Sequence, residues 1–178
     1  MKNFTRILGA ILAILMSSFF LGCERADSDE VADAIGTETP PIAGSLVLNE
    51  VVAKAADDGP DWVELYNRGE EELSLDGYGL QDDKDDNLFL FPEGLTLAPG
   101  EYLVIEGKNS AEDIHFPFGF GSDEAVRLID VDGTLVDILD WEEGEAPVGQ
   151  SYGRYPDGGE DMGTLESATY GTSNAPIN

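Results

Sequence analysis

The sequence has few of the residues on which disulfides, metal centres and nucleophilic active sites depend. Its 178 residues include one cysteine, Cys23, and one histidine, His115. A single cysteine excludes an internal disulfide and a zinc site built from several thiolates. His115 is the only imidazole available to a Ser-His-Asp or Cys-His arrangement, and within IHFPF we interpret it as an ordinary loop residue. Stability must therefore come from a packed core.

Basic residues are scarce as well. Nine Lys and Arg accompany 37 Asp and Glu, which gives a formal net charge of -28. Proteins attract phosphate backbones through clusters of Lys and Arg, and here the basic residues are scattered, so we predict no nucleic acid partner. The nearest candidate for a phosphate-binding glycine loop, GFGSDE, lacks the required Lys and the following helix. The excess of negative charge favours solubility and the attraction of cations.

Long apolar runs are absent except at the N-terminus. Lys2 and Arg6 are followed by a mainly apolar stretch over residues 7–21. As a helix rising ~1.5 Å per residue, this stretch would be about 22 Å long, which is shorter than the ~30 Å hydrocarbon core of a bilayer. A basic start and a short apolar run are typical of a secretory signal. We predict that residues 1–22 are a signal peptide rather than a membrane-spanning anchor.

The end of this run, Leu21-Gly22-Cys23, resembles the bacterial lipobox, in which a cysteine after a small residue is lipidated. The resemblance implies that Cys23 is a lipid attachment site and the mature N-terminus. Two or more acyl chains anchor a protein stably, whereas one chain does so only marginally. The predicted location is the bacterial cell envelope, outside the cytoplasm. Glu24 differs from the Asp of an inner-membrane retention signal, which slightly favours the outer membrane.

Residues 23–44 are predicted to be the lipidated cysteine and an acidic, flexible tether. The segment ERADSDEVADAIGTETPPIAG has one basic residue, many acidic ones, a Pro-Pro pair and no sustained strand or helix period. Like charges and proline favour an extended, disordered chain. We expect this tether to connect the anchor to a single folded domain over residues 45–178.

From Ser45 onward, short apolar runs alternate with Gly, Asp, Pro and Asn, a pattern typical of an all-β sandwich or barrel. Residues 46–52 (LVLNEVV) and 61–67 (DWVELYN) are predicted strands around a polar loop. Asp132-Gly133 marks the clearest hairpin, because an Asp-Gly pair can adopt the positive φ angles of a tight turn. The segment after SYGRYPDGG is predicted to be weakly structured.

Two further features of the domain follow from which apolar residues lie at alternate positions and so point to the same face of a strand. The apolar alternation changes phase at Asp76-Gly77, which indicates a bulge or tight turn between two short strands. Phe116, Phe118 and Phe120 share one parity in an irregular crossover, so their rings are expected to pack on the edge of the sandwich.

Polar residues interrupt the two opening strands, which carry apolar residues on both faces. Buried polar groups must find hydrogen-bond partners. We therefore interpret Asn49, Glu50, Glu64 and Asn67 as a structural hydrogen-bonding set, and a functional site is the alternative.

Calcium is the only cofactor that the composition favours. Asp83, Asp85 and Asn87 place oxygens at positions 1, 3 and 5 of a loop that resembles an EF-hand loop, while Leu88 and Gly94 replace the Gly and Glu expected at positions 6 and 12. A second acidic loop contains Asp57, Asp58 and Asp61. The alternative to a calcium site is a solvated acidic surface, with no cofactor at all.

Residues 46–174 contain, in this order, the segments LVLNEVV, DWVELYN, LSLDGYGLQDD, FPEGLTLAPGEYLVI, EAVRLIDVDGTLVD, GQSYGRYPDGG and YGTSN. Together these segments resemble the lamin tail domain, an immunoglobulin-like sandwich that also occurs in many bacterial surface proteins. The resemblance implies an immunoglobulin-like antiparallel β-sandwich with a binding or scaffolding role, and it brings no catalytic residues. We therefore expect a non-catalytic, lipid-anchored module with an unknown protein or polysaccharide partner. The alternatives are a calcium-binding adhesion module, an accessory domain to a secreted hydrolase, and a hydrolase that uses a pair of acidic residues.

Overall fold

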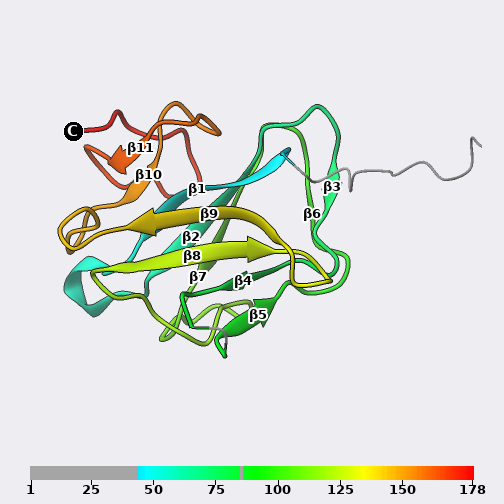
Figure 1. Ribbon diagram of the computed structural model, residues 1–178, viewed down its shortest axis with the longest axis horizontal. Helices are drawn as coiled ribbons and strands as arrows, with labels where there is room; N and C mark the ends of the chain where they lie inside the picture. The colour runs from blue at the N-terminus through cyan, green and yellow to red at the C-terminus, as the bar shows by residue number, and fades with distance from the viewer. Residues whose placement is uncertain (1–43, 85) are drawn as a thin grey trace, which may run out of the picture. The chain divides into compact units, whose positions relative to one another are not determined.

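The computed structural model describes residues 44–84 and 86–178, and these consist of β-strands, turns and one short 3-10 helix (Figure 1). No helix within these ranges has the length and apolar character needed to cross a bilayer. The elements are β1 (Leu46–Val52), η1 (Ala56–Asp58), β2 (Trp62–Asn67), β3 (Leu73–Ser74), β4 (Gly79–Gln81), β5 (Leu88–Leu90), β6 (Thr96–Leu97), β7 (Tyr102–Glu106), β8 (Glu124–Ile129), β9 (Leu135–Trp141), β10 (Tyr152–Arg154) and β11 (Met162–Thr164).

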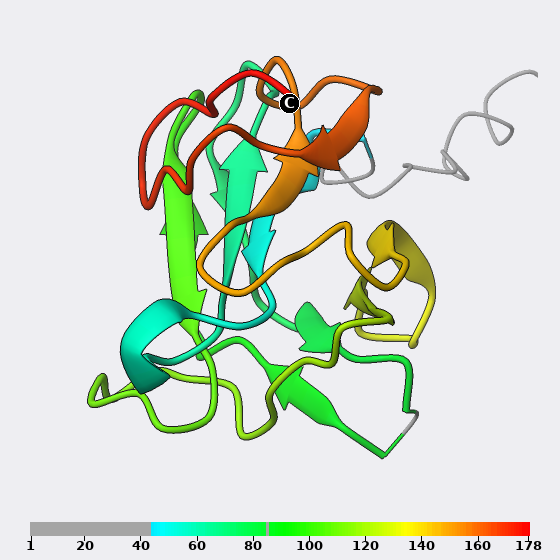
Figure 2. The ribbon, with the colours of Figure 1, turned by 90° about the vertical axis from the view of Figure 1, so that its left-hand side faces the viewer.

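Two antiparallel sheets form a β-sandwich. The larger has the strand order β11-β10-β1-β2-β7, and the smaller has the order β5-β4-β8-β9. The short strands β3 and β6 pair separately beside them. Figure 2 shows the two sheets as separate layers joined by loops. The predicted fold class, an antiparallel β-sandwich, is confirmed.

The two opening runs form the centre of the larger sheet, as predicted. β1 and β2 pair antiparallel, with Glu50 opposite Glu64 and Val51 opposite Val63. Every residue of β1 is buried. This explains its apolar residues on both faces: one face packs in the sandwich and the other is covered by the C-terminal segment.

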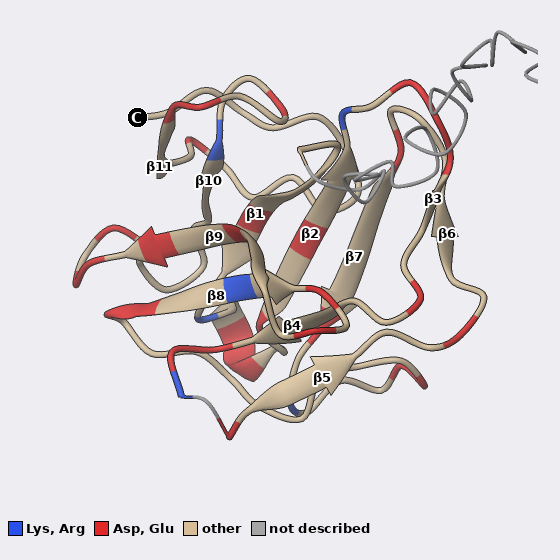
Figure 3. Cartoon of the chain, turned by 45° about the vertical axis from the view of Figure 1, so that its right-hand side comes forward, with Lys and Arg blue, Asp and Glu red and all other residues tan. Residues whose placement is uncertain are grey.

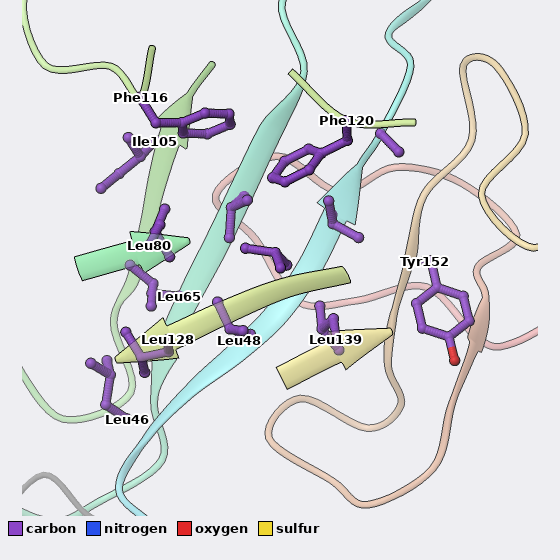
Figure 4. Packing of buried hydrophobic residues seen from close by; sticks show 14 of the residues in the cluster. Leu46, Leu48, Leu65, Leu80, Ile105, Phe116, Phe120, Leu128, Leu139 and Tyr152 are labelled. Carbon is purple, nitrogen blue, oxygen red and sulfur yellow. The ribbon is translucent and has the colours of Figure 1, made fainter. Parts of the chain in front are cut away.

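The hydrophobic core lies between the two sheets (Figure 4). Leu48 and Leu65 come from the larger sheet, and Leu80, Leu128 and Leu139 come from the smaller one; all five are fully buried. Burial of such side chains contributes about 1.5–3 kcal/mol each relative to exposure, so this layer replaces the cross-links that the sequence lacks.

Phenylalanine rings close one end of the core. Phe116 and Phe118 have ring centroids 4.8 Å apart, and Phe120 packs edge-on against Trp141 at 5.5 Å. The predicted packing of this crossover on the sandwich is confirmed, although the rings lie deeper than an edge position because Phe116 is completely buried.

Both predicted turns are present, and the hairpin turn is longer than expected. At Gly77, with φ of 81°, the chain turns from β3 into β4 of a different sheet. In the β8–β9 hairpin only Gly133 of the Asp-Gly pair has a positive φ, 78°. The turn begins at Asp130, whose carboxylate accepts the N–H groups of Asp132 and Thr134. This side-chain acceptor explains the extra length.

The prediction of a weakly structured C-terminal segment is wrong. β11 pairs with β10, and Leu165 is fully buried. The backbone N–H of Leu165 donates to the carbonyl of Ser151 at 2.9 Å, and that of Asn178 donates to Thr164 at 2.9 Å. Few of these residues alternate in hydrophobicity, so no periodic pattern was present from which the ordered structure could be predicted.

Candidate functional site

The predicted lipid attachment site, Cys23, lies outside the described residues, as do the predicted signal peptide and nearly all of the tether. Acylation of Cys23 therefore stays a prediction. The described residues show what the folded domain contains.

A polar cluster is buried under the outer face of the larger sheet, around a bulge in β1. The register of the β1–β2 pairing shifts between Leu48 and Glu50, and the extra residue is Asn49. Its side-chain amide donates to Glu64 at 2.9 Å and to Asp157 at 2.9 Å. Its side-chain oxygen accepts the N–H of Gly158 at 3.0 Å. A bulge can redirect a side chain in this way, so Asn49 connects β2 to the segment after β10.

Residues 169–174, which we call the C-terminal strap, cover the carboxylates of this cluster. The backbone N–H and the hydroxyl of Thr169 both donate to Glu50, at 3.1 and 2.7 Å. The N–H of Gly171 donates to Glu64 at 2.8 Å. Figure 3 shows the acidic bands of β1 and β2 in the middle of the sheet, where few other charges lie. The strap thus supplies the hydrogen bonds that buried carboxylates require.

Burial also shifts the pKa values in the cluster. Desolvation raises the pKa of Glu64 to about 7, against hydrogen bonds from Asn49 and Gly171, and the negative charges of Glu50 and Asp157 add to the rise. Burial likewise raises the pKa of Glu50. Asp157 is different: burial opposes its ionisation, yet hydrogen bonds from Ser173, Asn49 and other donors leave its pKa below the ordinary value. Ionisation is therefore favoured at Asp157 and opposed at Glu50 and Glu64.

A raised carboxyl pKa is one mark of a general acid, so access to these groups is important. Glu50 and Glu64 are fully buried. Two cavities among the described residues, of about 280 and 370 Å³, are lined by other residues than Glu50, Glu64 and Asp157. Burial is the cause of the raised pKa values, and the donors that each carboxylate binds hold the strap in place.

Asp61 is the carboxyl with a raised pKa that does line a cavity. Burial raises its pKa, and Lys54 and Asp58 line the same cavity of about 370 Å³. One oxygen of Asp61 accepts the N–H of Phe120 at 2.8 Å, and its backbone carbonyl accepts that of Gly107 at 2.7 Å. These bonds hold the phenylalanine-rich crossover against β2, which gives Asp61 a structural role.

The structure separates Asn67 from the other three members of the predicted polar set. Its amide donates to the carbonyls of Glu71 and Leu97 at 2.8 and 2.9 Å, and its oxygen accepts the N–H of Gly69 at 2.9 Å. Asn67 therefore ties two loops to the end of β2. Asn49, Glu50 and Glu64 lie together.

The predicted calcium loop brings different oxygens together from those that the spacing indicates. Asp85 lies outside the described residues. The side-chain amide of Asn87 donates to Asp82 at 2.5 Å. In the described ranges, the group of potential ligands is Asp82, Asp83 and Glu124, whose carboxylate oxygens lie within 4.8 Å of one another. The spacing of the acidic loop could not indicate Glu124, because Glu124 belongs to β8, far along the chain.

Lys84 lies among these carboxylates. Its ammonium group is 2.7 Å from Glu124, 3.0 Å from Asp83 and 3.8 Å from Asp82. Hydrogen bonds to Glu124 and Asp83 raise the pKa of Lys84, and the hydrogen bond from Lys84 lowers that of Asp83. Any divalent cation at this position must compete with the ammonium group.

Calcium binding can be tested through this competition. Extracellular modules commonly bind calcium with Kd on the order of 10⁻⁴–10⁻³ M, so calcium at about 1 mM should raise the free energy of unfolding by about 0.4–1.4 kcal/mol. We expect Lys84→Met to enlarge this gain and Asp83→Asn to remove it. Thermal melts in calcium and in sodium chloride of matched ionic strength measure the difference. Equal shifts in both salts for all variants would show a solvated acidic loop without a calcium site.

Comparison with known protein families matches residues 39–143 to the lamin tail domain, which is more than half of the chain. Comparison with curated proteins gives no match. The matched range contains β1 to β9 and ends shortly after Trp141, the last residue of β9. Its antiparallel sandwich is the immunoglobulin-like fold expected of this family. The chain belongs to the lamin tail domain family.

Proposed function

We propose that the protein is a non-catalytic binding or scaffolding module held at the bacterial cell envelope by a lipid on Cys23. The observation that supports the non-catalytic role best is the polar cluster beneath the strap. Its buried carboxylates Glu50 and Glu64 bind strap donors and do not line either cavity. These carboxylates thus hold the strap against the sheet.

The anchor is proposed from Leu21-Gly22-Cys23 and the apolar run before it. Several acyl chains on one cysteine would anchor the protein without help from its charge. That charge, -28, would keep the domain away from anionic headgroups. The acidic tether would then carry the domain into the surrounding space, outside the cytoplasm, with the outer membrane favoured.

Replacement of Cys23 is the direct test of the anchor. Cys23→Ser is expected to move the protein from the membrane fraction to the soluble fraction, or to leave an uncleaved precursor, because the acyl acceptor is lost. Fractionation followed by mass spectrometry of the N-terminus measures both results. Ser28→Ala, a change of similar size in the tether, should leave the protein acylated and in the membrane fraction. A wild-type N-terminus that is unmodified, or that begins before residue 23, would refute the anchor.

A calcium-binding adhesion module is the second candidate, and the meeting of Asp82, Asp83 and Glu124 supports it. The salt-matched melts described above decide between it and a cation-independent module. An accessory role beside a secreted hydrolase is compatible with both a calcium-binding module and a cation-independent one. The partner in all these cases would be a protein or polysaccharide at the envelope, with no nucleic acid.

A further inference from the structure

β7 is the outermost strand of the larger sheet. The strand order places β2 on one side of β7, and within the described ranges no strand lies on the other. Figure 3 shows β7 at the end of the row of strands, next to β2. An open strand edge presents backbone N–H and C=O groups that can pair with an added strand.

The alternation of hydrogen bonds between β2 and β7 shows which backbone N–H and C=O groups of β7 face outward. The N–H of Asn67 donates to the carbonyl of Glu101 at 3.1 Å, and the N–H of Gly107 donates to Asp61 at 2.7 Å. Alternation along an antiparallel ladder therefore directs the backbone of Tyr102 and Val104 away from β2. Beyond them, the carbonyl of Glu106 accepts the N–H of Phe116, so the crossover closes that end of the edge.

A groove follows this edge. The cavity of about 280 Å³ is lined by Leu103 and Ile105 of β7, together with Leu95 and Ile114. Leu103 and Ile105 lie opposite Leu65 and Val63 of β2 and so belong to the core face of the sheet. This side of the groove is apolar.

The same groove is lined from the opposite face of the sheet. Val104 and Glu106 pair with Glu64 and Trp62 and lie on the strap side, where the hydroxyl of Tyr170 donates to Glu106 at 3.2 Å. Because one cavity contains residues from both faces, it must run along the edge of the strand rather than over either face. Its volume is thus located where an added strand would lie.

The charge of the strap side is negative. Glu106 and Glu112 both act on Tyr170 and raise its pKa, after the larger effect of burial. Glu112 and Asp113 also line the groove. Successive side chains of a strand point to opposite faces. A matching strand would therefore direct apolar side chains toward Leu95 and Ile114, and basic ones toward Glu106 and Glu112.

We propose that the β7 edge binds an extended peptide segment of a partner protein in which apolar and basic residues alternate. Backbone hydrogen bonds to Tyr102 and Val104 provide the pairing, and the two sides of the groove select the side chains. A second copy of this chain fits poorly, because each copy carries a charge of -28. The inference rests on the binding role proposed above, but it does not depend on lipidation of Cys23.

The probe is the blocked hexapeptide Lys-Val-Lys-Val-Lys-Val, added to the full chain in a mild nonionic detergent. We expect saturable binding by calorimetry, with slower hydrogen exchange at the amides of Tyr102 and Val104. N-methylation of alternate peptide amides removes the N–H donors of the peptide. Val104→Pro removes the outward N–H donor of β7. Each change should weaken binding about tenfold or more. Proline is tolerated at an edge strand when its N–H would face outward, and a thermal melt checks that the variant stays folded.

The matched control is Val104→Thr, which keeps the outward amide and nearly the same shape, and it should bind as the unchanged chain does. The peptide Lys-Lys-Lys-Val-Val-Val has the same charge without the alternation and should bind about tenfold more weakly. Equal binding by the two peptides, or binding unaffected by N-methylation, would overturn the proposal and leave only charge attraction. Failure of the alternating peptide to bind would overturn it as well. A natural partner cross-linked to another face would refute the β7 site alone and leave the binding role standing.

Discussion

Arg154→Met is expected to lower the free energy of unfolding by about 3–5 kcal/mol, the typical cost of removing one partner from a buried ion pair. The guanidinium group of Arg154, on β10, lies 2.8 Å from the carboxylate of Asp137, on β9. The side chains are only 4% and 15% exposed. This ion pair connects the two sheets of the sandwich.

The pair also satisfies the backbone at the bulge of β1. Arg154 donates to the carbonyl of Leu48 at 2.9 Å, while Asp137 accepts the N–H of the same residue at 2.8 Å. A third bond joins Arg154 to the carbonyl of Gly159 at 2.6 Å. Methionine fills a similar volume but donates no hydrogen bonds. It leaves Asp137 charged and the Leu48 carbonyl without its side-chain donor, which is the main source of the expected cost.

Denaturant unfolding of matched variants measures this effect. Arg68→Met is the control, because Arg68 pairs with Glu160 at the surface, at 3.4 Å and with 87% of the Glu160 side chain exposed. Arg68 also donates to the carbonyls of Gly44 and Gly158, so the change should cost about 1–2 kcal/mol. The double change Arg154→Met/Asp137→Leu should recover part of the loss, since no buried charge is left unpaired. If Arg154→Met and Arg68→Met cost the same, the ion pair does not hold the sheets together.

Stability is expected to rise as the pH falls from about 8 to about 5, and Glu64 is expected to cause most of that rise. Its pKa is about 7 in the folded chain, against an ordinary value of 4.5. Because the folded state binds the proton more tightly, the contribution of Glu64 is fully present below pH 4.5 and is lost as the pH rises through 7. The shift corresponds to about 3 kcal/mol at most. Glu50, whose pKa is also raised, acts in the same direction.

Asp157 limits how far the stability continues to rise as the pH falls. Its pKa is below the ordinary value of 3.8 because several donors bind its ionised form despite burial. It therefore contributes stability above that value and loses it as the pH falls further. We expect the stability curve to pass through a maximum near pH 4–5 and to decline on the acid side.

Urea unfolding of Glu64→Gln from pH 4.5 to 8 tests the assignment. Glutamine does not ionise, so the rise in stability toward acid pH should become much shallower. Stability should be lower at acid pH, because the amide nitrogen cannot accept the N–H of Gly171 as the carboxyl oxygen does. Glu160→Gln is the matched control at an exposed position and should leave the slope unchanged. A slope that persists unaltered in Glu64→Gln would locate the titrating group elsewhere.

The strands were predictable because their signal is local. The runs at β1 and β2 carry apolar residues in a pattern that a buried strand requires, and the Gly77 and Gly133 turns contain residues suited to positive φ. The length of the β8–β9 turn was not predictable from the Asp-Gly pair, since it depends on which N–H groups the carboxylate of Asp130 accepts.

The polar contacts were only half predictable. The apolar residues on both faces of the two strands indicated that Asn49, Glu50 and Glu64 would be buried and would need hydrogen-bond partners. Those partners are Asp157 and the strap, which lie more than 100 residues further along the chain. Irregular segments give no periodic signal, so nothing in the sequence located them. The calcium prediction shows the same limit, because Glu124 joins the acidic loop only through the pairing of β4 with β8.

The place of β10 in the larger sheet has a consequence for where this domain can be cut. Family similarity ends at residue 143, yet β10 lies between β1 and β11 and brings Arg154 with it. A fragment that stops at the end of the similarity would lack β10 and would expose the edge of β1 at Glu50 and Val51, where β10 pairs. Such bare strands recruit other chains, so that fragment would precipitate or form inclusion bodies. The shortest soluble product has to continue through the C-terminal strap.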